Sequence, residues 1–84
     1  MNTGRFDRAY FIGIGGIGMS ALARYFIQKN WMVAGYDKTP TTLTKQLSKE
    51  GVSIHYEDAI QEIPKDFKDI EKTLVVYTPA VPSG

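Results

Sequence analysis

The stretch that decides the fold is FIGIGGIGMSALARYF, from Phe11 to Phe26, in which four glycines fall within six residues. A short apolar run precedes these glycines, and a helical pattern follows them. Glycine loses more conformational freedom on folding than any other residue. Four glycines where a strand meets a helix therefore predict that other backbone, or a ligand, approaches the main chain closely at this point.

The composition excludes several classes of function. The 84-residue chain is long enough for one small domain. Its net charge of +1 gives no reason to expect nucleic acid or a membrane surface as a partner. It has no cysteine, which excludes disulfides, thiolate metal sites and a cysteine nucleophile. The polar leader, residues 1–8, lacks the apolar segment of a signal peptide, and no apolar run reaches membrane-spanning length, so we expect a cytoplasmic protein.

Short apolar runs alternate with helical patterns along residues 9–84. Strands are expected at 9–14, 31–37, 52–56 and 74–77, and helices at 18–30, between TPTT and Gly51, and at 58–63. In the first helix, Gly18, Leu22, Tyr25 and Phe26 form the expected apolar face. The alternation predicts an α/β fold, a Rossmann-like parallel sheet of about four strands with helices on both faces. Because such sheets usually continue, we expect the chain to be part of a longer one.

The glycines satisfy a dinucleotide-binding pattern in its required context. Gly13, Gly15 and Gly18 match G-x-G-x-x-G, with Gly16 as an additional glycine, and Asp37 follows about twenty residues later at the end of the next strand. Gly13 is predicted to make the turn, Gly15 to leave room for a diphosphate, and Gly18 to let the helix pack on the sheet. The helix N-terminus would hold the phosphates. The alternative is a close-packed turn without a ligand.

The pattern does not identify the diphosphate. In a dinucleotide site, Asp37 would accept hydrogen bonds from a ribose and would disfavour a 2′-phosphate. The loop DKTPTT, which starts at Asp37, adds Lys38 and threonine hydroxyls that are suited to a base or a sugar. A turn-capping role is the structural alternative for Asp37. A nicotinamide-dinucleotide domain therefore stays open at this point.

Three segments resemble the N-terminal part of the Mur ligase family, and within it the enzymes that add L-alanine to UDP-N-acetylmuramate in peptidoglycan synthesis. These segments are GIGGIGMSALA, GYDKTPT and VVYTPAV. The doubled glycine followed by GMS is the distinctive feature, because generic dehydrogenase fingerprints lack it. The resemblance implies a Rossmann-like domain, residues 9–84, that binds the UDP-sugar. It also implies a second domain with a P-loop for ATP and magnesium, and a third domain that completes the site.

The resemblance also implies a set of substrate-binding residues, with the diphosphate near residues 13–20 and the uridine near residues 37–39. The full set is Gly13, Gly15, Gly16, Ile17, Gly18, Met19, Ser20, Asp37, Lys38, Thr39, Thr78, Pro79 and Ala80. The sequence contains no G-x-x-x-x-G-K-[ST], so no ATP site is expected in these residues. No catalytic residue and no metal ligand is expected either, and the implied acyl-phosphate chemistry would need the rest of the parent enzyme.

Two positions depart from the family pattern. Many members have a histidine where this chain has Tyr10, and a Gly-His pair where it has Glu57 and Asp58. His55 is close to the second position but out of register, and we expect it to be structural. The alternatives to the leading interpretation are an NAD-binding domain, a related ligase that recycles murein peptides, and a non-binding interaction domain of the same fold.

Overall fold

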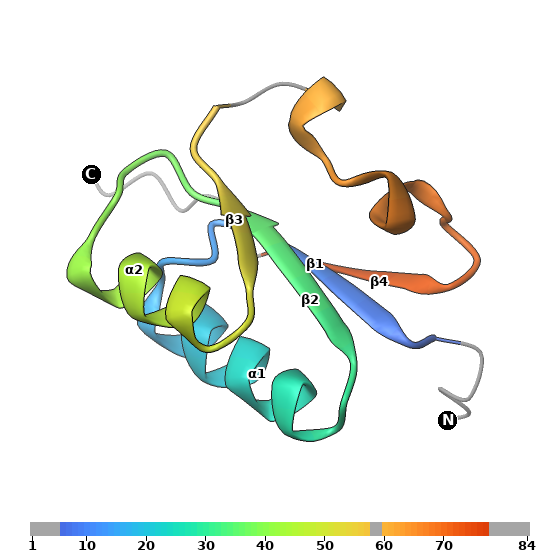
Figure 1. The fold of residues 1–84 in the computed structure, drawn as a ribbon, viewed down its shortest axis with the longest axis horizontal. Coiled ribbons are helices and arrows are strands. Elements are labelled where there is room, and N and C mark those ends of the chain that lie inside the picture. Colours follow the sequence, from blue (N-terminus) through green and yellow to red (C-terminus); the bar gives the residue numbers. More distant parts are fainter. Residues whose placement is uncertain (1–5, 58–59, 78–84) are drawn as a thin grey trace, which may run out of the picture.

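The computed structural model describes residues 6–57 and 60–77, which form a four-stranded, fully parallel sheet (Figure 1). The strands are β1 (Arg8–Ile12), β2 (Met32–Tyr36), β3 (Ser53–His55) and β4 (Thr73–Tyr77). Their order across the sheet is β3-β2-β1-β4. This is the order of the first four strands of the doubly wound fold, 3-2-1-4, and it confirms the predicted α/β fold.

The two faces of the sheet are covered by different kinds of helix. The α-helices α1 (Ile17–Gln28) and α2 (Thr42–Lys49) pack on one face, and the short 3-10 helices η1 (Ile60–Glu62) and η2 (Lys65–Lys68) lie on the other (Figure 1). Within the described residues, the helix predicted at 58–63 is only the short 3-10 helix η1, and Pro64 then starts the second one, η2, as its N-cap. Residues 58 and 59 lie outside the described part.

The main hydrophobic core lies between the sheet and the two α-helices. On β1, Ala9 and Phe11 point into this core, whereas Tyr10 points to the opposite face, as alternation along a strand requires. The buried members of the core are Ala9, Phe11, Ile14, Met19, Ala23, Phe26, Val33, Leu47 and Val52. A smaller cluster under η2 contains Tyr10, Ala34 and Phe67.

The face that α1 buries differs from the predicted one. Leu22 and Tyr25 are 38% and 49% exposed, whereas Ser20 is 3% exposed. The small side chain of Ala23 sits at the centre of the buried face, next to Phe26, where it allows the helix to approach the sheet closely. Ser20 is tolerated there because its hydroxyl donates to the carbonyl oxygen of Ile17 at 2.8 Å.

The helix ends follow local sequence signals. Thr41 caps α2, with its side chain accepting from the Thr44 N–H at 3.1 Å and the Thr44 hydroxyl accepting in return from the Thr41 N–H at 2.8 Å. Gly51, which follows the C-cap of α2, has a φ of +110°, as predicted for a glycine at this position. Asn30 ends α1 in the same left-handed region, with a φ of +65°.

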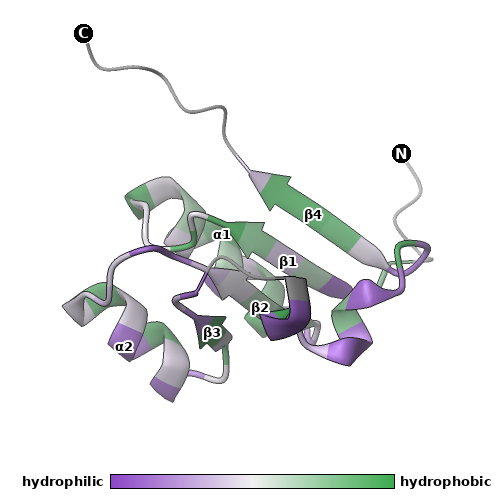
Figure 2. Cartoon of the chain, turned by 90° about the horizontal axis from the view of Figure 1, so that it is seen from above, coloured by the Kyte–Doolittle hydropathy of each residue, from purple (hydrophilic) through white to green (hydrophobic). Residues whose placement is uncertain are grey.

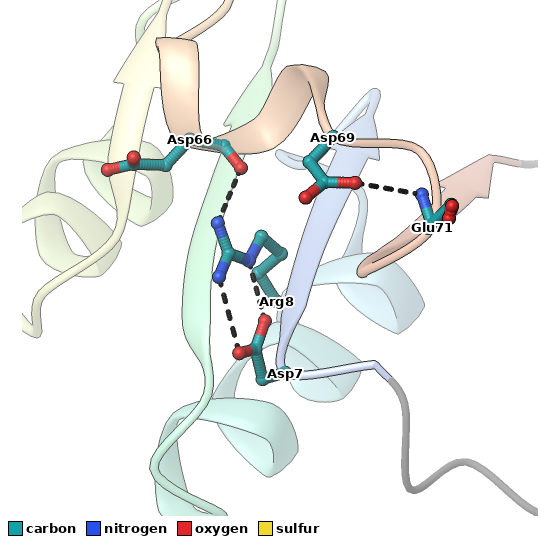
Figure 3. Close-up of polar contacts among 5 residues, drawn as sticks. All are labelled: Asp7, Arg8, Asp66, Asp69 and Glu71. Carbon is teal, nitrogen blue, oxygen red and sulfur yellow. Dashed lines mark hydrogen bonds and ion pairs between the residues drawn. The ribbon is translucent and has the colours of Figure 1, made fainter.

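Arg8 attaches η2 to the beginning of the sheet (Figure 3). Its guanidinium donates to the Asp66 carbonyl oxygen at 2.7 Å and to the Asp7 carboxylate at 2.6 Å. This hydrogen bond from Arg8 lowers the pKa of Asp7. Close by, the Asp69 carboxylate accepts from the Glu71 N–H at 3.1 Å and shapes the turn that enters β4. These polar contacts lie at the end of the sheet where β1 and β4 begin, opposite the end that carries the glycine loop.

The carboxyl-terminal half of the second face is apolar and exposed. Ile12 and Tyr77 are register partners, 46% and 63% exposed, and Val75 lies on the same face of β4. Figure 2 shows β4 as a largely apolar strand at the edge of the sheet. Among the described residues, β4 pairs only with β1. No helix in this part of the chain has the length and apolar character needed to cross a membrane.

Candidate functional site

The glycine loop leaves the carboxyl end of β1 through a tight turn. Gly13 has a φ of +84°, which confirms its predicted role as the turn residue. The N–H groups of Gly13 and Ile14 both donate to the carbonyl oxygen of Tyr36, at 2.8 and 3.0 Å. The Gly16 N–H then donates to the Gly13 carbonyl oxygen at 3.2 Å. The loop is therefore held against the end of β2, at the sheet edge where doubly wound folds bind ligands.

The first turn of α1 presents three N–H groups that the helix itself does not use. Gly16 is the N-cap and has no side chain to cap the helix. The first intrahelical bond runs from the Ser20 N–H to the Gly16 carbonyl oxygen at 2.8 Å, so Ile17, Gly18 and Met19 have no intrahelical acceptor. The first turn of this helix carries no acidic residue. Such a helix N-terminus favours an anion, phosphate in particular.

Asp37 connects the glycine loop to the loops that follow β2 and β3. Its Oδ2 accepts from the Gly15 N–H at 2.7 Å, and its Oδ1 accepts from the Thr39 N–H at 3.0 Å. Its own N–H donates to the carbonyl oxygen of His55 at 3.2 Å. The Oδ1 bond has the geometry of a turn cap, so the structural alternative for Asp37 is confirmed for this oxygen.

The position of the Asp37 side chain leaves no room for a side chain at Gly15, even without a ligand. A Cβ added at Gly15 would lie 2.6 Å from the Asp37 Oδ2 and 3.2 Å from the Thr44 Cγ2. The sequence pattern predicts that the missing side chain at Gly15 leaves room for a diphosphate. In the structure the Asp37 carboxylate occupies part of this space, and the Gly15 N–H already donates its hydrogen bond to that carboxylate. The main-chain donors that remain for an anion are those of Ile17, Gly18 and Met19.

Several predicted residues have different surroundings from those expected. The packing role predicted for Gly18 is wrong, because this glycine is exposed and an added Cβ would meet nothing within 4 Å. The side chains of Met19 and Ser20 are buried, so these residues offer the site main-chain atoms only. Lys38 and Thr39 are exposed beside Asp37. Thr78, Pro79 and Ala80 lie outside the described residues, and so does Asp58.

Sequence reasoning missed the importance of Gly35, in the middle of β2. A Cβ at Gly35 would lie 2.8 Å from the Ile14 Cδ1 and 2.9 Å from the Phe11 carbonyl oxygen. Gly35 therefore lets Ile14 fold back over β2 directly after the turn at Gly13, which sets the path of the glycine loop. A glycine inside a strand pattern is the signal that could have identified it.

Metal binding finds no support in this part of the chain. In residues 6–57 and 60–77, no group of three or more His, Cys, Asp or Glu side chains is placed to hold a metal ion.

The comparison with known proteins identifies the family. The sequence model of the Mur ligase family, catalytic domain, matches residues 8–84. The chain belongs to the Mur ligase family. Its glycine loop and Asp37 lie within the matched residues, so the site described above belongs to the part of the chain that defines this membership.

Relatives from several bacteria carry the same name. UDP-N-acetylmuramate–L-alanine ligase of Flavobacterium psychrophilum is 61% identical over 86 residues, and that of Parabacteroides distasonis is 57% identical over 84 residues. Both alignments cover 100% of this chain and 18% of the relative. The enzyme of Cytophaga hutchinsonii is 53% identical over 99% of the chain and 18% of its own length. The chain thus spans about a fifth of the length of these relatives.

Proposed function

We propose that this chain is the UDP-N-acetylmuramate-binding N-terminal domain of an ATP-dependent ligase that joins L-alanine to UDP-N-acetylmuramate in peptidoglycan synthesis. The observation that carries the proposal is the set of three N–H groups at Ile17, Gly18 and Met19, which face the ligand edge of the sheet with no intrahelical acceptor. The names of the relatives, at 53 to 61% identity, support the choice of a UDP-sugar over other diphosphates.

The residues of this chain would bind and orient the substrate. The diphosphate would accept hydrogen bonds from the first turn of α1, where the helix dipole adds a favourable interaction with negative charge. The uridine would lie beside the exposed Lys38 and Thr39, at the end of β2. Residues 78–80, after β4, would border the nucleotide or the sugar.

The chemistry itself would belong to other parts of the parent protein. The muramate carboxylate would take the γ-phosphoryl group of ATP and release ADP, and the amine of L-alanine would then attack the acyl carbon and release inorganic phosphate, with magnesium supplying charge stabilisation in the parent enzyme. Because the sequence has no phosphate-binding P-loop, the chain by itself would carry no ligase activity.

The proposal is tested by NMR titration of the ¹⁵N-labelled chain with UDP-N-acetylmuramate, UDP and NAD in parallel. We expect the UDP compounds to shift the amides of Ile17, Gly18 and Met19 at lower concentration than NAD. Gly18→Val is the sharpest variant, because Gly18 is exposed, an added Cβ there meets nothing within 4 Å, and the residue lies in the helical turn proposed to bind the phosphates. We expect it to weaken binding at least tenfold, about 1.4 kcal/mol.

Ala21→Val is the control, since it places a valine at an exposed position of α1 about one turn further on, although it adds two carbons where Gly18→Val adds three. This variant should bind UDP like the original chain. If NAD shifts the glycine-loop amides first, a dinucleotide-binding function replaces the proposed one. If none of the three ligands shifts them, the titration is repeated with the complete gene product, and failure there refutes the proposal.

A further inference from the structure

A histidine and a tyrosine that the proposed function does not use are joined across the second face of the sheet. The Tyr10 hydroxyl lies 2.5 Å from the His55 Nε2, and the two rings stack with centroids 5.9 Å apart. Tyr10 is 6% exposed, on the central strand β1, and His55 is half-buried at the end of β3. These residues are 45 positions apart in the sequence, with β2 between their strands.

The contact depends on a small residue in the intervening strand. In the sheet register, Tyr10 pairs with Ala34, whereas His55 pairs with Tyr36 two residues further along β2. The Tyr10 side chain therefore crosses β2 diagonally, over a position that carries only a methyl group. Phe67 of η2 packs against the Tyr10 ring, with centroids 6.4 Å apart.

The His55 ring is fixed at both of its nitrogens. Its Nδ1 lies 2.8 Å from the Glu57 carbonyl oxygen. Since a carbonyl oxygen only accepts, Nδ1 is the donor, and Nε2 of the neutral ring accepts from the Tyr10 hydroxyl. The two hydrogen bonds therefore tie the His55 ring to Tyr10 on one side and to the main chain after β3 on the other.

The main chain of His55 is in turn hydrogen-bonded to Asp37, at the sheet edge that carries the glycine loop. Its carbonyl oxygen accepts the Asp37 N–H at 3.2 Å, and the Asp37 carboxylate holds the N–H groups of Gly15 and Thr39. Three hydrogen bonds, joined through the covalent frames of His55 and Asp37, therefore connect the Tyr10 hydroxyl to the glycine loop.

We propose that Tyr10 is a positioning residue for the nucleotide site, which acts through His55 and Asp37 on the glycine loop without touching the ligand. The inference rests on the proposed function, because the ligand that benefits is the nucleoside diphosphate. Its structural part, the coupling of Tyr10 to Gly15, stands independently of which ligand binds.

The test begins with Tyr10→Phe, which removes only the hydroxyl and keeps the ring packed against Phe67. In the ¹⁵N-labelled chain without ligand, we expect the amides of Asp37 and Gly15 to shift. The double variant Tyr10→Phe/His55→Phe should show the same shifts as His55→Phe alone, because the hydroxyl acts through the His55 ring. If Tyr10→Phe does not fold, His55→Phe tests the same connection.

The matched control is Tyr25→Phe, which makes the same chemical change on α1, where the Tyr25 ring packs against Phe26. Tyr25 is 49% exposed and lies about two helical turns from the glycine loop. We expect this control to leave the Gly15 and Asp37 amides unmoved. Unchanged Gly15 and Asp37 amides in Tyr10→Phe, or equal shifts in the control, overturn the coupling.

In the complete ligase, we expect Tyr10→Phe to raise the KM for UDP-N-acetylmuramate about three- to tenfold, the range that one net hydrogen bond supplies, and to leave the KM for ATP unchanged. An unchanged KM for the UDP-sugar, in an enzyme whose original form is active, overturns the positioning role. An original enzyme without activity on UDP-N-acetylmuramate refutes the proposed function instead, and the amide shifts still decide the coupling.

Discussion

The replacement of Gly15 by alanine tests whether this glycine serves Asp37. The new Cβ would lie 2.6 Å from the Asp37 Oδ2 and 3.0 Å from its Cγ, so the carboxylate has to move. The movement breaks the 2.7 Å bond from the Gly15 N–H. A hydrogen bond to a charged group contributes about 1.5–3 kcal/mol, and the half-buried carboxylate recovers part of this from water. Alanine returns about 0.4–1 kcal/mol by restricting the unfolded chain.

The net expectation for Gly15→Ala is a loss of about 1–2 kcal/mol in the free energy of unfolding, from the difference between these two contributions. Gly18→Ala is the internal control, because its Cβ meets nothing within 4 Å. It should gain about 0.4–1 kcal/mol. Urea unfolding at 25 °C, followed by circular dichroism, measures both. In a domain of this size, the two melting temperatures should differ by about 6 °C or more.

A double-mutant cycle separates the aspartate from other causes. In an Asp37→Ala background the carboxylate is absent, so Gly15→Ala should lose most of its cost, and the remainder reports the contact with Thr44. The reasoning is refuted if Gly15→Ala and Gly18→Ala are equally stable. It is also refuted if the cost of Gly15→Ala is the same with and without the Asp37 carboxylate.

Two further predictions concern the scaffold. Gly35→Ala should lower the free energy of unfolding, measured in urea, by about 1–3 kcal/mol. Its Cβ would lie 2.8 Å from the Ile14 Cδ1 and 2.9 Å from the Phe11 carbonyl oxygen, and a main-chain oxygen cannot rotate out of the way as a side chain can. An unchanged urea midpoint would contradict the close packing of the glycine loop. Arg24 donates to Glu50 at 2.8 Å and lowers the pKa of that carboxyl. The folded-state pKa is below the unfolded one, so the pair's contribution is complete above the unfolded pKa and disappears as the pH falls through the folded pKa. Stability measured from pH 7 down to pH 3 should therefore fall less in Glu50→Gln than in the original chain, and parallel curves would contradict this.

The order of the elements was predictable from the sequence because its signals are local. A β-branched run, a Thr-x-x-Thr cap or a glycine after a helix acts on neighbours within a few residues. The strands, both α-helices, the turn at Gly13 and the C-terminal glycine at Gly51 were therefore predicted correctly, within two residues or so at their ends. The parallel pairing also followed, because a helix between two strands returns the chain to the same end of the sheet.

The tertiary structure alone decided which side chains meet at the site. Which face of α1 is buried depends on the closeness of approach that Ala23 allows, and Phe67 of η2 packs in a cluster with Tyr10 and Ala34, which are distant in the sequence. The hydrogen bond from the Gly15 N–H to the Asp37 carboxylate joins residues 22 positions apart, and the Tyr10–His55 contact joins residues 45 positions apart. No periodicity or spacing encodes such pairs, because their distance is fixed only when the register of the whole sheet is set.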